Sequence, residues 1–135
     1  RRQRQMCIRD RYKAGEQFFA NGAYTDQKDV FDIYAFFFDN SNGTSMLDGS
    51  LPSNGYTHPD MVAVARIKDA HETDEWTSFS LNFDYDSFGK GVDAQKLAEG
   101  KYSLGIVMSS SKDGASFEGA PGSTLLIDEM ELIFE

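Results

Sequence analysis

The sequence has little cysteine, little proline and no long run of apolar residues. Its 135 residues include a single cysteine, Cys7, and three prolines. One thiol excludes an internal disulfide framework, and it leaves residues 12–135 without a thiolate for catalysis or for binding zinc. No apolar segment approaches the ~20 residues that a helix needs to cross a bilayer. The length is that of one domain.

Positive charge is also scarce beyond the first residues. The formal net charge is -9, but residues 1–13 carry +5 and the remaining 122 residues carry -14. A surface this acidic repels phosphate backbones, which excludes general nucleic-acid binding. The basic segment lacks the apolar stretch and the small-residue cleavage site of a secretory signal. It is either a functional basic arm or a foreign segment. We expect residues 1–11 to be foreign or disordered, with the domain spanning residues 12–135.

Aromatic residues are plentiful, and their spacing is that of β-strands. Eleven Phe and an apolar share of 40% are enough to fill a core. Apolar and polar side chains alternate in residues 76–85, and residues 30–38 are apolar on both faces, which predicts a strand covered on both sides. Similar runs recur at 61–67, 102–109 and 124–134, between segments rich in Gly, Asn, Asp and Ser. The pattern predicts an all-β, antiparallel sandwich of the jelly-roll kind.

Two local irregularities are expected. In residues 124–134 the apolar positions before Asp128 share one parity and those after Glu129 share the other, so we expect a bulge or kink there. Residues 93–99 (DAQKLAE) predict one short helical turn, because Asp93 can cap its start and Gly100 can end it.

The C-terminal third carries a specific motif, YSLGIVMSSSKDGASFEGAPGSTLLIDEMEL at residues 102–132. It combines a strand, the Ser109–Lys112 loop, the Phe117–Ser123 stretch and a strand with a central Asp, and upstream Asp32–Ala35, Thr73–Thr77 and Leu97–Gly100 fit the same pattern. On these residues the chain, from about residue 12 to residue 135, resembles the putative carbohydrate metabolism domain, a β-sandwich of gut-bacterial surface lipoproteins.

The resemblance implies that N-terminal strands are missing from the sandwich. Members of the family have further strands that end in a Gly-Tyr-Tyr-Lys-Tyr run, of which only Tyr12-Lys13 is present here. We therefore expect the aromatic residues of 31–38 to be partly bare, with marginal stability and a tendency to aggregate. A longer protein would supply the N-terminal remainder.

The resemblance also implies a function. It suggests a non-catalytic module that binds a glycan or polysaccharide, on a bacterial protein that is secreted or held at the outer surface. The lack of cysteine in residues 12–135 fits that location. Two other functions stay open: a glycoside hydrolase that uses a pair of carboxylates, and a structural or protein-contact domain. No cofactor is required by any of the three.

Trp76 is the first candidate for a ligand contact. By alternation the indole faces outward with the polar row that contains Asn82 and Asp84, where it can stack on a sugar while the polar groups bind hydroxyls. The alternative is that Trp76 packs over the sheet edge as part of the core. Lys112 and Asp113, in the loop 109–123, are further candidates, and the alternative for that loop is a solvated connection. Tyr56 and His58 are weaker candidates of the same kind.

Acidic residues and histidines give fewer indications. Asp128 lies in the last strand at the expected irregularity, where a carboxylate is bulged, paired or bound to a cation. The resemblance makes a structural calcium ion at Asp128 a hypothesis, with Glu129 as the alternate ligand. His58 and His71 lie in polar segments without metal-ligand spacing, which favours a solvated role. No motif pairs two carboxylates.

Overall fold

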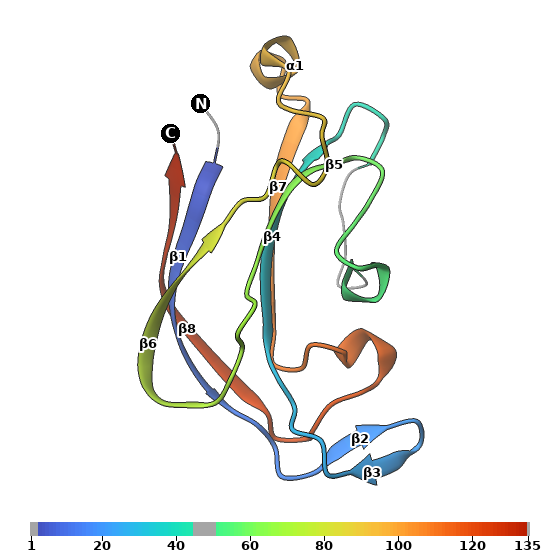
Figure 1. The fold of residues 1–135 in the computed structure, drawn as a ribbon, viewed down its shortest axis with the longest axis vertical. Helices are drawn as coiled ribbons and strands as arrows, with labels where there is room; N and C mark the ends of the chain where they lie inside the picture. The colour runs from blue at the N-terminus through green and yellow to red at the C-terminus, as the bar shows by residue number, and fades with distance from the viewer. Residues whose placement is uncertain (1–2, 45–50, 135) are drawn as a thin grey trace.

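Two three-stranded antiparallel sheets make up the body of the molecule in the computed structural model, which describes residues 3–44 and 51–134 (Figure 1). The first sheet has the order β6-β1-β8 and the second the order β5-β4-β7. The strands are β1 (Gln3–Lys13), β4 (Asp32–Asp39), β5 (Met61–Arg66), β6 (Thr73–Asn82), β7 (Tyr102–Ser109) and β8 (Thr124–Phe134). A small hairpin of β2 (Phe18–Ala20) and β3 (Ala23–Thr25) lies at one end. The predicted all-β sandwich is confirmed.

The helical segments are short. The predicted turn is α1 (Ala94–Ala98), and the Asp93 carboxylate caps it by accepting a 2.9 Å hydrogen bond from the Lys96 amide. Gly100 follows with a φ of 70°, a left-handed conformation that favours glycine. Two 3-10 turns, η1 (Leu51–Asn54) and η2 (Gly114–Ser116), lie in loops. Across the described ranges, no helix has the length and apolar character needed to span a membrane.

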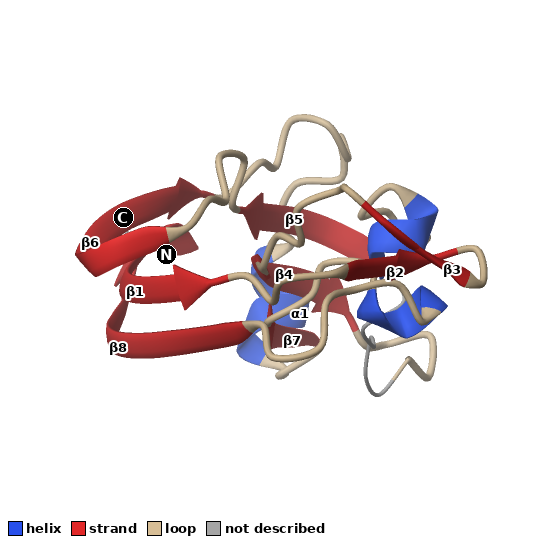
Figure 2. Ribbon diagram, turned by 90° about the horizontal axis from the view of Figure 1, so that it is seen from below, coloured by secondary structure: helices blue, strands red, loops and turns tan. Residues whose placement is uncertain are grey.

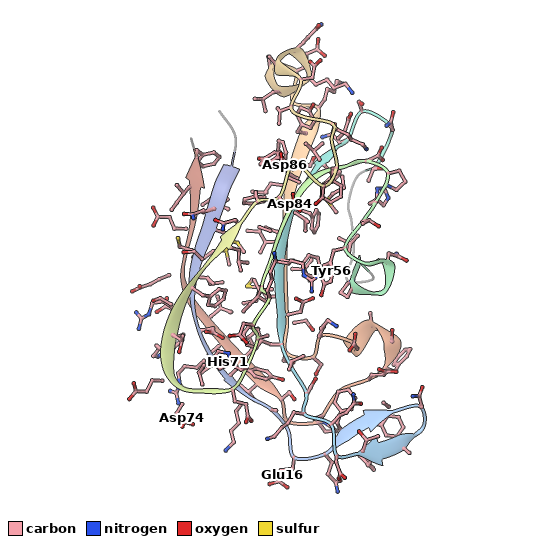
Figure 3. All side chains as sticks on the ribbon, in the orientation of Figure 1. Glu16, Tyr56, His71, Asp74, Asp84 and Asp86 are labelled. Carbon is pink, nitrogen blue, oxygen red and sulfur yellow. The ribbon has the colours of Figure 1, made fainter. Side chains whose placement is uncertain are left out.

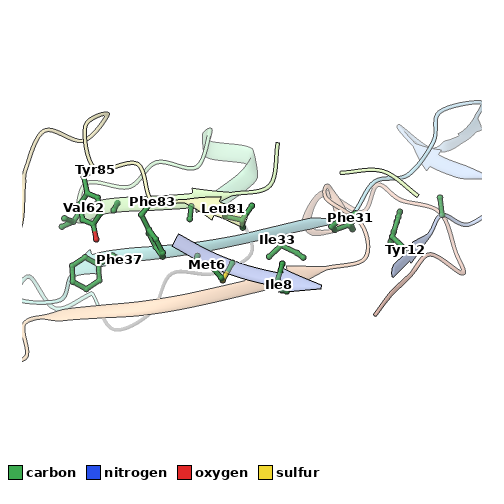
Figure 4. Packing of buried hydrophobic residues seen from close by; sticks show 14 residues of the cluster. Met6, Ile8, Tyr12, Phe31, Ile33, Phe37, Val62, Leu81, Phe83 and Tyr85 are labelled. Atoms are coloured by element: carbon green, nitrogen blue, oxygen red, sulfur yellow. The ribbon is translucent and has the colours of Figure 1, made fainter. Parts of the chain in front are cut away.

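The main core lies between the two sheets (Figure 4). Its central side chains come from the facing sides of β1, β4, β5 and β6: Met6, Ile8, Ile33, Phe37, Val62 and Leu81. A second cluster covers the other face of β4, where Tyr34, Phe36 and Phe38 pack against Leu51 and Tyr56 of the loop around η1. The expectation that the aromatic residues of 31–38 are partly bare is therefore wrong, because this loop covers the face that adjoining strands would otherwise protect.

Residues 3–11 of the basic segment are part of the fold, so the expectation of disorder is wrong for them. They form most of β1, the central strand of its sheet, which pairs with both β6 and β8. Met6, Ile8 and Tyr12 point into the core and are fully or almost fully buried. Arg9 and Arg11 alternate with them on the outward face, so this segment has an ordinary strand pattern despite its strongly basic composition.

The irregularity in β8 is confirmed as a bulge. Cys7 pairs with Glu131 and Arg9 with Asp128, so three steps along β8 correspond to two along β1. Glu129 supplies the irregular backbone with a φ of 52°. The extra residue allows the apolar residues on both sides of it to pack against the same core, which explains the change of parity in the sequence.

Candidate functional site

β5 and β6 are edge strands that lie on the same side of the two sheets (Figure 2). A cleft lies between them. Val64 of β5 and Asp84, two residues beyond the end of β6, exchange backbone hydrogen bonds of 3.3 and 2.8 Å. Away from this bridge their edges diverge and enclose a cavity of about 680 Å³. That volume is within the range of small-ligand sites.

The walls of the cleft combine aromatic rings with polar groups. The aromatic residues are Phe31, Tyr56, Phe79 and Phe88, and the polar or charged ones include Asp10, Arg66, Lys68, Asp69, His71, Ser78, Ser80, Asn82 and Asp84. In Figure 3, Asp84 lies near the upper end of this region, His71 near the lower end, and Tyr56 on the loop beside β4. A cavity that combines aromatic rings with convergent polar groups is typical of binding sites for small ligands.

Tyr56 and Arg66 line the cleft, and the buried Asp32 lies behind them. The Tyr56 hydroxyl donates a 2.7 Å hydrogen bond to the Asp32 carboxylate, and the Arg66 guanidinium lies 3.8 Å from the centre of the Tyr56 ring. Burial raises the pKa of Asp32, although Tyr56 and Arg66 oppose the rise. Burial and the adjacent Asp32 carboxylate raise the pKa of Tyr56. The Nε of Arg66 is buried and has no hydrogen-bond partner among the described residues.

Asp10 is the most unusual group in the cleft. It lies on the inward face of β1, opposite Thr77 of β6, and is 2% exposed. Its Oδ2 has no hydrogen-bond partner within the described part of the chain. Burial raises the pKa of this carboxyl, and the nearby His71 acts in the opposite direction. Because burying a carboxylate without a partner is costly, such a group is explained more readily by a ligand than by stability.

Two of the predicted site residues line the cleft. Asn82 accepts a 2.8 Å hydrogen bond from the Gln5 side chain. Asp84 accepts hydrogen bonds from the backbone and hydroxyl of Ser87, at 3.1 and 2.5 Å, and these bonds lower its pKa. The weaker candidate Tyr56 also lines the cleft, whereas His58 does not line it.

Trp76 lies outside the cleft, on the outward face of β6. Its side chain is 39% exposed, and the Arg9 guanidinium lies 5.5 Å from the centre of the indole ring. Arg9 in turn pairs with Glu129 at 3.1 Å. The indole thus faces outward as predicted, but it is partly covered by an arginine side chain and is not joined to Asn82 or Asp84 in one cavity.

Lys112, Asp113 and Asp128 also lie away from the cleft. Lys112 and Asp113 form an exposed ion pair of 3.8 Å in the loop between β7 and β8. The Asp128 carboxylate accepts a 2.8 Å hydrogen bond from the Glu129 amide, which supports the bulge. Within residues 3–44 and 51–134, no three side chains of His, Cys, Asp or Glu come together to hold a metal ion. The hydrogen bond to Glu129 gives the Asp128 carboxylate a local role in the backbone, and calcium binding by Asp128 stays a prediction.

The register of β1 and β6 places the carboxylates of Asp10 and Asp84 far apart. Asp10 is opposite Thr77, and Asp84 follows Thr77 by seven residues along the same extended segment. At about 3.3 Å per residue, the separation is roughly 20 Å. The two carboxyls of a glycosidase lie about 5 to 10 Å apart. Asp10 and Asp84 are therefore too far apart to act on one glycosidic bond.

Three residues of the cleft were missed by sequence reasoning. Asp10 was set aside with the basic segment, although its neighbours Met6, Ile8 and Tyr12 already show strand alternation. His71 was assigned to solvent for lack of metal-ligand spacing. Arg66 ends an apolar strand and carries no motif. Only the meeting of β5 with β6 brings the three together.

Comparison with known proteins is consistent with a carbohydrate-related domain. The model of the family described as putative carbohydrate metabolism domain matches residues 10–133. A solved structure of a putative glycoside hydrolase from Bacteroides vulgatus ATCC 8482 is 52% identical with a TM-score of 0.92, covering 97% of this chain and 52% of that chain. Another, from Bacteroides thetaiotaomicron VPI-5482, is 46% identical with a TM-score of 0.89, covering 98% of this chain and 38% of that chain.

The chain thus spans about half the length of the first solved relative and less of the second. No curated protein matches the sequence.

Proposed function

Because the chain belongs to the putative carbohydrate metabolism domain family, we propose that it is a non-catalytic module that binds a glycan in the cleft between β5 and β6. One observation carries the proposal. Asp10 Oδ2 and Arg66 Nε are buried, have no hydrogen-bond partner among the described residues, and belong to residues that line the same cleft. An ionised carboxylate only accepts hydrogen bonds and a guanidinium only donates them. Sugar hydroxyls do both, so one glycan can satisfy both groups.

The aromatic rings of the cleft support the same ligand class. Tyr56, Phe79 and Phe88 line the walls beside hydroxyl and amide side chains. Sugar rings present apolar C–H faces and polar edges, so a cleft with both kinds of surface suits them. Binding would be reversible and would consist of ring contacts and hydrogen bonds.

A glycoside hydrolase is the alternative from another class. Two solved relatives carry the name putative glycoside hydrolase, and each is a longer chain than this one. The separation of Asp10 from Asp84 weighs against cleavage by this pair of residues. An assay for reducing sugars released from mixed polysaccharides distinguishes the two functions, because a binding module yields no product.

A panel of immobilised polysaccharides and oligosaccharides tests the proposal. We expect binding to at least one glycan, and weaker binding by the Arg66→Gln variant. The Trp76→Ala variant is the matched control, because Trp76 lies on the outward face, and we expect it to bind like the parent. If the parent is folded and binds no glycan in the panel, a structural or protein-contact role replaces this proposal.

The location of the protein is a separate proposal. We propose that the module acts outside the cytoplasm, where polysaccharides occur, as part of a longer secreted or surface-held protein. The absence of cysteine from residues 12–135 is in accord with this location. Immunolabelling of intact cells tests it: labelling without permeabilisation is expected, and labelling only after lysis would contradict it.

A further inference from the structure

Among the acids that line the cleft, Asp10 differs in its charge environment. Three side chains in the lining can carry positive charge, and each lies near another acid. The charge of Arg66 opposes the rise in the pKa of Asp32, and the charge of Lys68 helps to lower the pKa of Asp84. The third, His71, has its Nδ1 3.9 Å from the Asp69 carboxylate. Asp10 is the acid that remains, because its Oδ2 accepts no hydrogen bond from the described residues.

His71 favours the ionised form of Asp10 electrostatically, but its effect does not outweigh the effect of burial. Its field lowers the pKa of Asp10 by less than burial raises it. The Nδ1 of His71 is instead 2.9 Å from the backbone oxygen of Asp69. A backbone hydrogen bond also lowers the pKa of Asp10, but Oδ2 itself accepts no hydrogen bond from the described residues, so a ligand meets an acceptor that is open at this oxygen.

A hydroxyl group can donate one hydrogen bond to such a carboxylate, but it brings no charge. An ammonium group brings three donors and a full positive charge, and a buried carboxylate gains most from a partner of that kind. The torsion χ2 of Asp is soft, so a small rotation can present Oδ2 to the cleft. The net charge of -9 also draws cations toward the protein.

We propose that the glycan bound in the cleft is an amino sugar oligomer, whose protonated amine pairs with the Asp10 carboxylate. This inference rests on the proposed function and names the ligand class for the same site. It assigns to Asp10 the selection of the ligand, while Arg66 and the aromatic walls serve sugars in general.

A matched pair of ligands tests the inference. β-1,4-linked glucosamine oligosaccharides and cello-oligosaccharides of equal length share a backbone and differ at carbon 2, which carries an amine in one and a hydroxyl in the other. Calorimetric titrations at about pH 5 keep the amine protonated, because even an amine acidified by neighbouring oxygens titrates above that pH. We expect the glucosamine oligomer to bind at least about tenfold more tightly, as a buried charge pair allows.

Two variants separate pairing with Asp10 from general attraction to an acidic protein. Asp10→Asn should remove the preference for the amine, and Asp69→Asn, which changes an exposed acid of the same cleft, should keep it. Asp10→Ser is the second variant if Asp10→Asn does not fold, and circular dichroism checks folding in each case.

Every outcome decides the inference. Equal affinity for the two oligomers overturns it and leaves the proposed function intact. A preference that survives in the Asp10 variants also overturns it, because the attraction is then nonspecific. If neither oligomer binds, the ligand class is wrong, and the wider glycan panel then decides the proposed function independently.

Discussion

The hydroxyl of Tyr56 donates a 2.7 Å hydrogen bond to the carboxylate of Asp32, and both side chains are buried, at 4% and 2% exposure. This bond fixes the loop around η1 to β4. It thereby closes the outer face of the second sheet and builds one wall of the cleft. Stability and the proposed binding site therefore depend on the same pair of residues.

Removal of this hydroxyl is expected to destabilise the fold. Tyr56→Phe leaves the Asp32 carboxylate buried without its donor, which costs about 1–3 kcal/mol of unfolding free energy. Urea titration followed by tryptophan fluorescence measures the loss. Tyr24→Phe is the matched control, because Tyr24 is 61% exposed and should change stability little. Equal stability of the two variants would mean that the Tyr56 bond does not hold the loop.

Asp10 is expected to lower stability at neutral pH. The folded-state pKa is raised above the ordinary value of 3.8, so the folded protein binds the proton more tightly than the unfolded chain. Stability therefore falls as pH rises from the ordinary pKa through the raised one, and the penalty is constant above it. Asp10→Asn should be more stable than the parent at neutral pH and lose this advantage in acid. Thermal melts across this range measure it, and an advantage that grows in acid would contradict it.

Gly15 is expected to tolerate no side chain. A Cβ atom there would lie 2.2 Å from the backbone oxygen of Pro121, which cannot move aside easily. Gly15→Ala should destabilise the fold by about 1–3 kcal/mol, as overpacking does. Gly114→Ala is the control, since the nearest atom to its Cβ would be 3.7 Å away. Denaturant melts of both variants should show a large shift for the first and a small one for the second.

The basic segment is expected to be essential for folding. Met6 is completely buried, so Met6→Ala should cost about 2–5 kcal/mol. Arg11→Ala, on the exposed outward face of the same strand, should cost little. Chemical denaturation of the two variants provides the comparison. Two equally mild effects would show that β1 is not part of the core.

Strand positions could be predicted from the sequence because alternation is a local property. It located β4, β5, β6, β7 and β8, and the change of parity located the bulge at Glu129. The prediction fails at β1 for a physical reason. Arg9 and Arg11 face outward, so the net charge of the segment does not report on Met6, Ile8 and Tyr12, which face the core. In this segment the alternation of apolar residues predicts the strand, whereas the composition does not.

The cleft could be predicted only in part. Asn82, Asp84 and Tyr56 were recognised as polar or aromatic residues in turns and on a strand, and the structure places them around one cavity. The proximity of Asp10 to Arg66 and His71 depends on how two edge strands diverge, which no short-range pattern encodes. Alternation predicts that Trp76 faces outward beside Asn82 and Asp84; the indole does face outward, but Arg9 lies over its ring and it does not line the cleft.

An amide NMR titration of isotope-labelled protein, with the glycan that binds most tightly in the panel, tests the location of the binding site most directly. Trp76 is the only tryptophan, so its indole N–H gives a single signal that reports on the outward face. The account predicts shifts of the amides of residues 64–68 and 77–84, with the indole signal unchanged. Movement of the indole signal, with the amides of both ranges unperturbed, would contradict the cleft as the binding site.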